Sequence, residues 1–331
     1  MKAAHPPTLQ VAIERWPIAG AFTISRGSKT EAEVVVAEVS DGIYRGRGEC
    51  VPYGRYGETA QGVAAAIAAL APQVARGLDR AELQSALPAG AARNALDCAL
   101  WDLAAKRAGR PAHQLAGLPP PAARVTAYTI SLGSPDVMAA AAAKAAARPL
   151  LKVKLGQAGD PERIRAVRAA APRAELIVDA NEGWTAQDLA GNLAACAAAG
   201  VTLVEQPLPA ADDAALASFP HPIPVCADES VHDRASLARL AGKYDAINLK
   251  LDKTGGLTEA LALAAQAERM GFWLMVGCMI STSLAIAPAL LVASRARVVD
   301  LDGAQLLARD RPNGLHYDDS RVHPASPELW G

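Results

Sequence analysis

The sequence predicts an α/β protein built as a (β/α)8-type barrel, in the form of a modified TIM barrel, with a smaller α+β domain at its N-terminus. From residue 124 onward, eight short apolar runs recur about every 25 residues and alternate with alanine-rich helical segments, a spacing that suits repeated β-loop-α units. Before that point, β-rich runs are followed by helical ones. The 331 residues also exceed the about 200–250 that barrels alone often take, which leaves room for a second domain.

The N-terminal α+β domain is predicted from turn signals and from hydrophobic spacing. We expect strands at residues 8–16, 33–40 and 43–51 and helices at residues 59–75 and 91–107. Asp41-Gly42 lies between two apolar runs and is a strong hairpin signal. Gly109 follows the last helical segment and is a suitable helix stop.

Each barrel unit is predicted by an apolar run followed by a helical segment. The runs are residues 125–130, 150–155, 176–179, 202–205, 225–228, 246–250, 273–277 and 298–301, and helical segments stand out at 135–147, 161–170, 186–199 and 258–270. An open doubly wound sheet is the alternative. Such a sheet normally carries a glycine-rich phosphate-binding fingerprint, and neither GxGxxG nor GxxxxGK[ST] occurs in the sequence. Residues 310–331 are rich in proline and show no clear element.

The composition excludes several classes of partner. Hydrophobic residues make up 51% of the chain but aromatic ones only 4%, so Ala, Leu, Val and Ile must build the core. With 33 basic and 34 acidic residues, we expect no general attraction to nucleic acid or to an anionic membrane. No apolar run follows Lys2, so we expect no signal peptide, and no stretch is long enough to span a bilayer. Five scattered cysteines without a CxxC pair indicate reduced thiols in a cytoplasmic protein.

Carboxylates end three successive predicted strands of the barrel. Asp179, Glu205 and Asp228 end the third, fourth and fifth runs. Functional side chains of such barrels lie at the C-terminal ends of strands, so these three should converge at the barrel mouth. A single acidic residue there is more often a helix cap or an ion-pair partner. An ordered set of three oxygen ligands without Cys or His, however, suits Mg²⁺.

Three lysines occupy the ends of two other strands. Lys152 and Lys154 are two residues apart on one strand and point to the same side, where each should lower the pKa of the other toward that of a useful base. Lys250 ends a strand four places further on, which puts it across the mouth of an eight-stranded ring. One lysine would remove a proton next to a substrate carboxylate and the other would return it to the opposite face, while a metal and Lys152 stabilise the negative charge that forms.

With these residues the chain resembles the enolase superfamily, in its muconate-lactonizing subgroup. The segments that carry the resemblance are Lys152-Val153-Lys154, Asp179-Ala180-Asn181, Glu205-Gln206-Pro207, Ala227-Asp228-Glu229-Ser230, Asn248-Leu249-Lys250 and the capping-domain helix segment Ala95-Leu96-Asp97-Cys98-Ala99-Leu100-Trp101-Asp102-Leu103. Subgroups with a His base on the second side do not fit, because Lys250 occupies that place. The resemblance implies a capping domain at residues 1–118, a catalytic barrel at 119–309, a tail at 310–331 that packs back on the capping domain, and one Mg²⁺ per subunit.

Within the subgroup, the chain is most similar to dipeptide epimerases of the L-Ala-D/L-Glu type. Asp300-Leu301-Asp302 resembles the Asp-x-Asp pair that binds the α-ammonium of the dipeptide, and Arg26 resembles the mobile-loop Arg that meets the distal carboxylate of a Glu side chain. Cys278 and Met279 belong to a segment that resembles the pocket-lining seventh strand end. The resemblance implies an isomerase, a cytoplasmic homo-oligomer that epimerises a dipeptide during recycling of cell-wall peptide.

Other interpretations stay open at this point. Muconate cycloisomerisation, o-succinylbenzoate synthesis and N-acylamino acid racemisation use the same intermediate, as do epimerases for hydrophobic or cationic dipeptides. Their non-dipeptide substrates lack a free α-ammonium, so Asp300 and Asp302 would have no purpose there. The two aspartates could instead be structural ion-pair partners, Arg26 could be a solvated loop charge, and the fold could serve a catalytically silent small-molecule binder.

Overall fold

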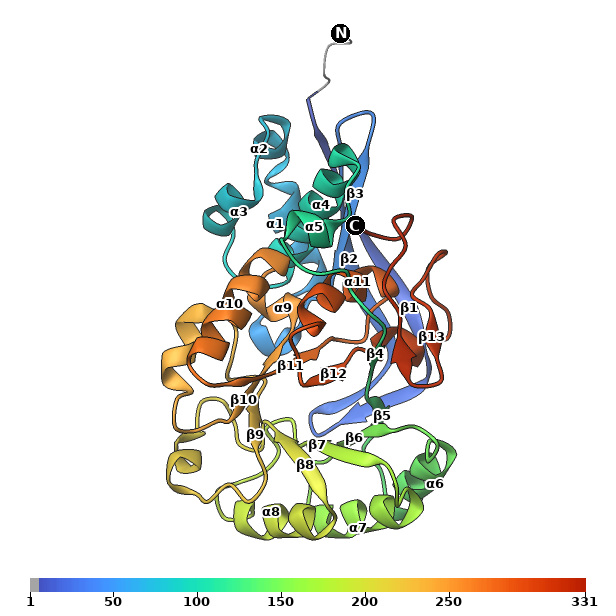
Figure 1. Ribbon diagram of the computed structural model, residues 1–331, viewed down its shortest axis with the longest axis vertical. Helices are drawn as coiled ribbons and strands as arrows, with labels where there is room; N and C mark the ends of the chain where they lie inside the picture. The colour runs from blue at the N-terminus through green and yellow to red at the C-terminus, as the bar shows by residue number, and fades with distance from the viewer. Residues whose placement is uncertain (1–5) are drawn as a thin grey trace.

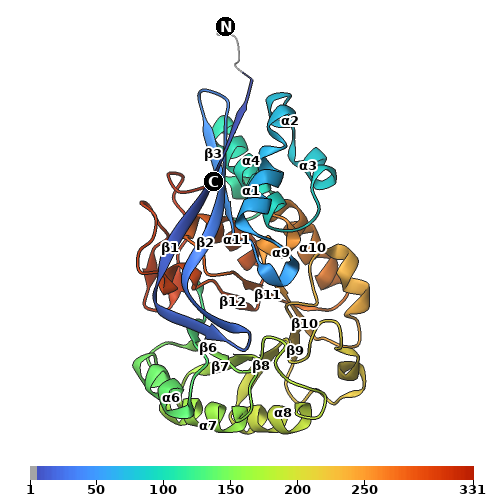
Figure 2. The same ribbon diagram turned by 180° about the vertical axis from the view of Figure 1, so that it is seen from behind.

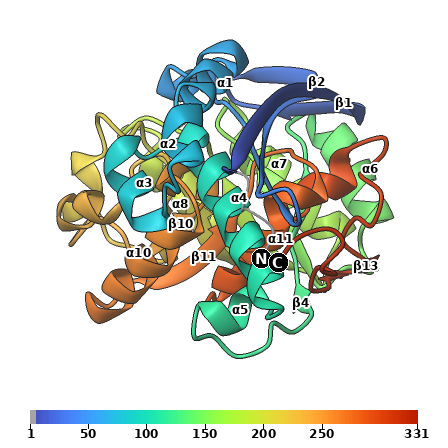
Figure 3. The ribbon, with the colours of Figure 1, turned by 90° about the horizontal axis from the view of Figure 1, so that it is seen from above.

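The computed structural model describes residues 6–331 and shows an N-terminal domain that overlies one end of a barrel (Figures 1 and 3). The expectation of no signal peptide falls in part on residues 1–5, outside the described residues. Strands β1 (Thr8–Ile24), β2 (Gly27–Ser40) and β3 (Arg45–Cys50) form an antiparallel sheet in that order. Because β1 and β2 are longer than the sequence predicts, their hairpin reaches down to the barrel (Figure 2). There the N–H of Leu132 donates to the carbonyl of Thr23 at 3.0 Å.

Helices pack on one face of this sheet and enclose a separate apolar core. They are α1 (Ala60–Ala68), α2 (Ala71–Ala75), α3 (Arg80–Ala86), α4 (Ala91–Ala108) and α5 (Ala112–Leu115), with a 3-10 turn η1 (Gly54–Tyr56) before them. The single helix predicted at residues 59–75 is wrong, since α1 stops at Ala68 and Pro72 lies in the first turn of α2, where its missing N–H breaks no helical hydrogen bond. Helix α4 lies so close to β3 that a Cβ atom at Gly46 or Gly48 would stand 2.1 Å from a carbonyl oxygen of the helix.

The predicted barrel is confirmed, with eight parallel strands in one sheet. In sheet order they are β5 (Tyr128–Ile130), β6 (Leu150–Lys154), β7 (Glu175–Asp179), β8 (Val201–Glu205), β9 (Val225–Ala227), β10 (Ala246–Leu249), β11 (Trp273–Gly277) and β12 (Val298–Asp300). The N–H of Ala127, just before β5, donates to the carbonyl of Val299 on β12 at 2.8 Å and so links the two ends of the sheet.

The connections between strands explain why the barrel is a modified one. Helices follow β5, β6, β7, β10 and β11: α6 (Pro135–Lys144), α7 (Asp160–Ala170), α8 (Leu189–Ala198), α9 (Leu251–Thr254) with α10 (Leu257–Arg269), and α11 (Ser283–Ala293). Short 3-10 helices stand in the other places: η2 (Ala214–Ser218), η3 (Arg234–Arg239) and η4 (Gly303–Leu306). In residues 6–331, no helix combines the length and the hydrophobicity needed to cross a membrane.

The tail, for which the sequence shows no clear element, contains a short hairpin. Strands β13 (Tyr317–Asp318) and β14 (Arg321–Val322) pair with each other, and β14 pairs with β4 (Arg124–Val125). Arg311 forms an ion pair with Glu49 of the N-terminal domain at 2.6 Å, and the indole N–H of Trp330 donates to the carbonyl of Cys98 at 3.0 Å. Through these contacts the tail packs on the N-terminal domain, while the boundaries at residues 118 and 309 stay a prediction.

Candidate active site

Side chains that point into the barrel form layers, and successive layers lie two residues apart along each strand. An apolar cluster fills the N-terminal part of the barrel interior and includes Leu150, Ile177, Leu203, Cys226, Ala246 and Val298. Side chains of a strand alternate between its faces, so the inward residue after each of these is two positions further on. Those next residues are Lys152, Asp179, Glu205, Asp228, Asn248 and Asp300, and all six are buried. The same alternation that builds the core therefore gathers the polar groups at the barrel mouth.

The three predicted metal ligands are brought together. Asp179, Glu205 and Asp228, at the ends of neighbouring strands β7, β8 and β9, each offer a carboxylate oxygen within 4.8 Å of the other two. All three are buried, and burial together with the charge of Asp179 raises the pKa of Glu205 to about 8. Three convergent carboxylates without a nitrogen or sulfur donor fit a hard divalent cation, whose charge would offset their mutual repulsion.

The predicted lysines flank this carboxylate cluster. Lys154 lies 2.6 Å from Asp179, and Lys250 lies 2.6 Å from Asp228. Their strands, β6 and β10, stand on either side of the three ligand-bearing strands in the sheet, as the sequence predicts. Lys152 shares its face with Lys154, because both ammonium groups contact the same oxygen of Asp179.

Lys152 lies at the centre of a carboxylate network. Its Nζ atom is 2.5 Å from Glu205, 2.7 Å from Asp300 and 3.2 Å from Asp179. Burial by itself lowers the pKa of Lys152, but Asp300 and Glu205 raise it well above its ordinary value. The expected depression by a neighbouring lysine is therefore wrong for Lys152, since the surrounding negative charge outweighs one added cation. The carboxylates around Lys152 therefore favour its positively charged form.

Asp300 and Asp302 line the same cavity of about 930 Å³ as the lysines. One oxygen of Asp302 accepts from the N–H of Thr129 at 2.8 Å, and burial together with the charge of Asp300 raises its pKa to about 7. Oδ1 of Asp300 is buried and has no hydrogen-bond partner among residues 6–331. Cys278 and Met279 also line this cavity, and the Cys278 thiol donates to the carbonyl of Asp300 at 3.5 Å.

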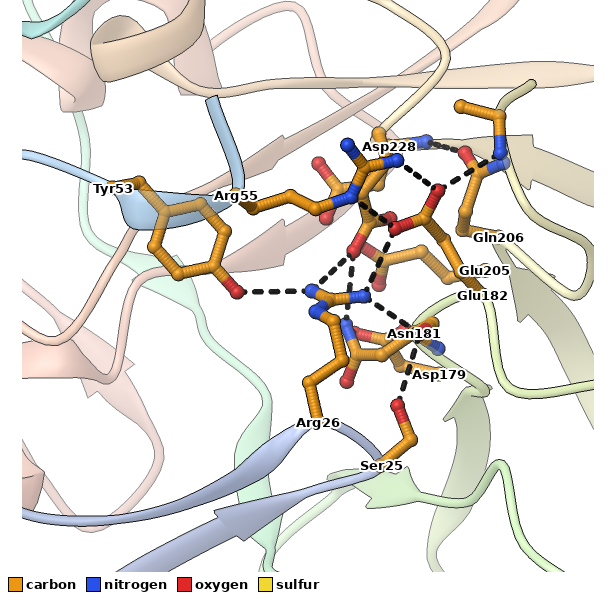
Figure 4. Close-up of polar contacts among 12 residues, drawn as sticks. Ser25, Arg26, Tyr53, Arg55, Asp179, Asn181, Glu182, Glu205, Gln206 and Asp228 are labelled. Carbon is orange, nitrogen blue, oxygen red and sulfur yellow. Dashed lines mark hydrogen bonds and ion pairs between the residues drawn. The ribbon is translucent and has the colours of Figure 1, made fainter. Parts of the chain in front are cut away.

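Arg26 reaches the cavity from the turn of the β1–β2 hairpin, far from the barrel in sequence. Its guanidinium donates to the carbonyl of Asn181 at 2.6 Å, to Glu182 at 3.2 Å, to the hydroxyl of Tyr53 at 2.9 Å and to Glu229 at 2.7 Å (Figure 4). The side chain is 27% exposed, so Arg26 is only partly buried. The hairpin thus closes one side of the cavity with a cation.

Two family comparisons cover nearly the whole described chain. Residues 7–117 match the N-terminal domain of the mandelate racemase / muconate lactonizing enzyme family, and residues 137–327 match the family described as enolase C-terminal domain-like. The chain belongs to the enolase superfamily. Both the predicted family and the barrel with its N-terminal domain are confirmed.

Relatives within the enolase superfamily are closely similar. The L-Ala-D/L-Glu epimerase of Escherichia coli (strain K12) is 51% identical over 96% of this chain and 99% of its own. The N-acetyl-D-glutamate racemase of a Pseudoalteromonas species is 45% identical over 90% of this chain and 95% of its own. A crystal structure of an enolase family member from Agrobacterium tumefaciens with homology to dipeptide epimerases, with bound sodium, L-Ala-L-Glu and an ordered loop, is 57% identical, covers 98% of this chain and 100% of its own, and has a TM-score of 0.97. The predicted enzyme class, an isomerase, is confirmed by these relatives.

Two polar residues of the site, Lys253 and Asn248, were not assigned a role from the sequence. Lys253 is buried below the cluster, 2.5 Å from Oδ1 of Asp228 and 3.0 Å from the carbonyl of Asn248. The Asn248 amide donates to Glu205 at 2.7 Å. Asn248 precedes Lys250 by two residues, so strand alternation alone could have placed it on the inner face. Lys253 lies in α9, after the strand, where no such periodicity applies.

Proposed function

We propose that the protein epimerises a dipeptide of the L-Ala-D/L-Glu type at the carbon next to its C-terminal carboxylate, by Mg²⁺-dependent 1,1-proton transfer between two lysines. The observation that carries the proposal is the placement of Lys154 and Lys250 on opposite sides of a three-carboxylate cluster, in a cavity that also contains Asp300 and Asp302. A proton acceptor and a proton donor on opposite faces of one carbon invert its configuration.

Asp179, Glu205 and Asp228 would hold one Mg²⁺ per subunit through their convergent oxygens. When bound, Mg²⁺ supplies a Lewis acid that polarises the substrate carboxylate and makes the adjacent C–H more acidic. Lys152, fixed in the cavity by its contacts with Glu205 and Asp300, adds a second positive charge to the side on which negative charge develops.

The two lysines then perform the proton transfer. One ammonium must first lose its proton to act as the base, while the other must keep its proton to act as the acid. Each is now paired with a ligand carboxylate, and burial of Lys250 is outweighed by Asp228 and Glu205, which raise its pKa. Nζ of Lys154 and Nζ of Lys250 would have to leave these ion pairs to reach the substrate carbon from its two faces.

The remaining charges of the cavity define the substrate. Asp300 and Asp302 would receive the α-ammonium of the dipeptide, and the buried free oxygen of Asp300 gives that ammonium an unused acceptor. Arg26 would meet the distal carboxylate of a Glu side chain, which would replace part of its pairing with Glu229 and Glu182. Cys278 and Met279 would line the pocket around the first residue of the dipeptide.

Racemisation of an N-acylated glutamate is the second candidate, since one relative of this chain is named an N-acetyl-D-glutamate racemase. An amide nitrogen carries no positive charge, so this substrate would leave two buried carboxylates, Asp300 and Asp302, without a cation beyond Lys152. The α-ammonium group of a dipeptide supplies such a cation to both aspartates. Cycloisomerisation and o-succinylbenzoate synthesis leave the pair unused in the same way, and dipeptides without an acidic side chain leave Arg26 without a ligand.

Proton exchange tests the proposal directly. L-Ala-L-Glu and L-Ala-D-Glu are incubated separately with enzyme in D₂O, with Mg²⁺ or with a chelator, and the Glu α-proton is followed by NMR. We expect Mg²⁺-dependent loss of the α-proton signal from both and interconversion of the two. No exchange with either dipeptide, together with exchange of N-acetylglutamate, would replace the proposal with the second candidate.

We also propose that the enzyme acts as a cytoplasmic homo-oligomer in the recycling of cell-wall peptide. The five cysteines are free thiols, four of them buried, which is the state expected in a reducing compartment. Sedimentation velocity of the full chain would report the oligomeric state.

A further inference from the structure

The outer face of the β13–β14 hairpin carries three side chains that are typical transition-metal ligands. The N–H of His323 donates to the carbonyl of His316 at 2.9 Å, so the two histidines are cross-strand neighbours on one face. Asp318 is two residues beyond His316 and shares that face by strand alternation. His316 and Asp318 are exposed and His323 is half-buried. None of the three contributes to the catalytic cavity.

The three side chains are close enough to share one ion. The two imidazole centroids are 4.9 Å apart, Nε2 of His323 is paired with a carboxylate oxygen of Asp318, and one ligand atom from each residue lies within 4.8 Å of the other two. Imidazole nitrogens at about 2.0–2.1 Å suit Zn²⁺ and its neighbours in the transition series, whereas Mg²⁺ prefers oxygen. The donor set therefore differs in kind from the carboxylate cluster of the barrel.

We propose that His316, Asp318 and His323 form a second metal site, which binds a divalent transition-metal ion such as Zn²⁺ at the surface of the tail hairpin. Water would complete the coordination, because the face is open to solvent. Arg321 is the cross-strand partner of Asp318 and lies on the same face, where its positive charge opposes the ion. The site should therefore bind the metal ion more tightly when Arg321 is replaced by a neutral residue.

Calorimetric titration of the untagged full chain with Zn²⁺, in excess Mg²⁺ to keep the barrel cluster filled, tests this site. We expect one Zn²⁺ per chain, loss of that binding in His316→Ala and His323→Ala, and tighter binding in Arg321→Gln. His113→Ala, which removes a histidine of α5 outside the hairpin, is the matched control and should bind as the unaltered chain does. Co²⁺ in place of Zn²⁺ should give a visible absorption band that the same two variants lose. An isotherm unchanged by both hairpin variants, or no binding to the unaltered chain, would overturn the proposal.

The inner face of the same hairpin is tied to the strand that carries the Asp pair. The hydroxyl of Tyr317 donates to the carbonyl of Leu301 at 2.8 Å, and the N–H of Leu301 donates to the hydroxyl of Thr126 at 2.8 Å. The N–H of Thr126 in turn donates to the carbonyl of Ser320 at 2.9 Å. The carbonyl of Leu301, which lies between Asp300 and Asp302, is therefore hydrogen-bonded directly by the tail, and its N–H is bonded to a residue, Thr126, that the tail holds in turn.

From this independent observation we infer that Tyr317 is a positioning residue for Asp300 and Asp302, an inference that rests on the proposed function. The two aspartates flank Leu301, so a rotation of its peptide groups would move both carboxylates away from a common ligand. Among residues 6–331, the Tyr317 hydroxyl donates to the carbonyl of Leu301 and forms no hydrogen bond with the carboxylate cluster or with the lysines. Its loss should therefore weaken ammonium binding and leave proton transfer intact.

Steady-state kinetics of Tyr317→Phe with L-Ala-L-Glu test the inference, because the phenyl ring keeps the packing and removes only the hydroxyl. We expect KM to rise about 2- to 12-fold, the range that one neutral hydrogen bond contributes, with kcat nearly unchanged. The matched control is Tyr44→Phe, an exposed tyrosine of the N-terminal domain, with no change in either constant. A lower kcat at constant KM would contradict the inference. A lower melting temperature with both constants unchanged would show a purely structural role. Absence of α-proton exchange in the unaltered enzyme would instead overturn the proposed function.

Discussion

Replacing Asp302 with Asn tests whether the cavity reads an ammonium group. The amide keeps the shape of the side chain, and its oxygen can still accept from the N–H of Thr129, which now lies 2.8 Å from the carboxylate. At a pH above about 7, where Asp302 is ionised, the substitution therefore removes one negative charge and little else. Asp302 is 4% exposed, so its contact with a substrate cation would be largely shielded from water.

The magnitude follows from that burial. Two unit charges 4 Å apart attract by about 4 kcal/mol at an effective dielectric constant of about 20, and a hydrogen bond to a charged group contributes a net ~1.5–3 kcal/mol. Because Asp300 remains in the variant as an acceptor for the ammonium group, the smaller of these two energies, ~1.5–3 kcal/mol, applies. We expect kcat/KM for L-Ala-L-Glu to fall about 10- to 150-fold, mostly through KM, since about 1.4 kcal/mol corresponds to a factor of ten.

Steady-state epimerisation measured by polarimetry, alongside N-acetyl-L-glutamate as an uncharged comparison, provides the assay. Asp302→Asn should not impair any turnover of N-acetyl-L-glutamate, because that substrate brings no cation. Asp212→Asn, an exposed position remote from the cavity, is the control for loss of one acidic residue. An unchanged KM for the dipeptide, or an equal loss with both substrates, would refute the ammonium assignment.

Three further results are expected. Burial and the charge of Asp300 raise the pKa of Asp302 to about 7. KM for the dipeptide should therefore fall as pH rises through 7 and the carboxyl ionises, and should rise again above about 8, where the α-amino group of the substrate loses its proton. A KM that does not change with pH would contradict this. Lys154→Ala and Lys250→Ala should each slow epimerisation about 10²- to 10⁴-fold, and NMR in D₂O should show that they retain α-proton exchange with opposite stereoisomers. Equal exchange with both stereoisomers in either variant would argue against two bases. In parallel kinetic assays, Arg26→Gln should raise KM for L-Ala-L-Glu and not for L-Ala-L-Leu. Equal effects on the two substrates would show that Arg26 does not bind the side-chain carboxylate of Glu.

The sequence by itself determined the barrel and the inner layer of its site. Strand alternation is a local property with a period of two, so an apolar residue such as Ile177 fixes the face on which Asp179 appears. Parallel strands in chain order then place carboxylates from β7, β8 and β9 side by side, with Lys154 and Lys250 to either side. No long-range information is needed beyond closure of the sheet.

Only the tertiary structure decided the contacts between segments far apart in the chain. The hairpin bearing Arg26 is 155 residues from its partner Asn181, and no periodicity relates the two positions. The raised pKa of Lys152 depends on how many carboxylates surround it, and Asp300 comes from a strand 148 residues away. The same holds for the tail, where Tyr317 reaches Leu301 through packing of a two-residue strand too short to show a pattern. Local sequence sets the direction of a side chain, while the distances and charges that define its chemistry come from the closed fold.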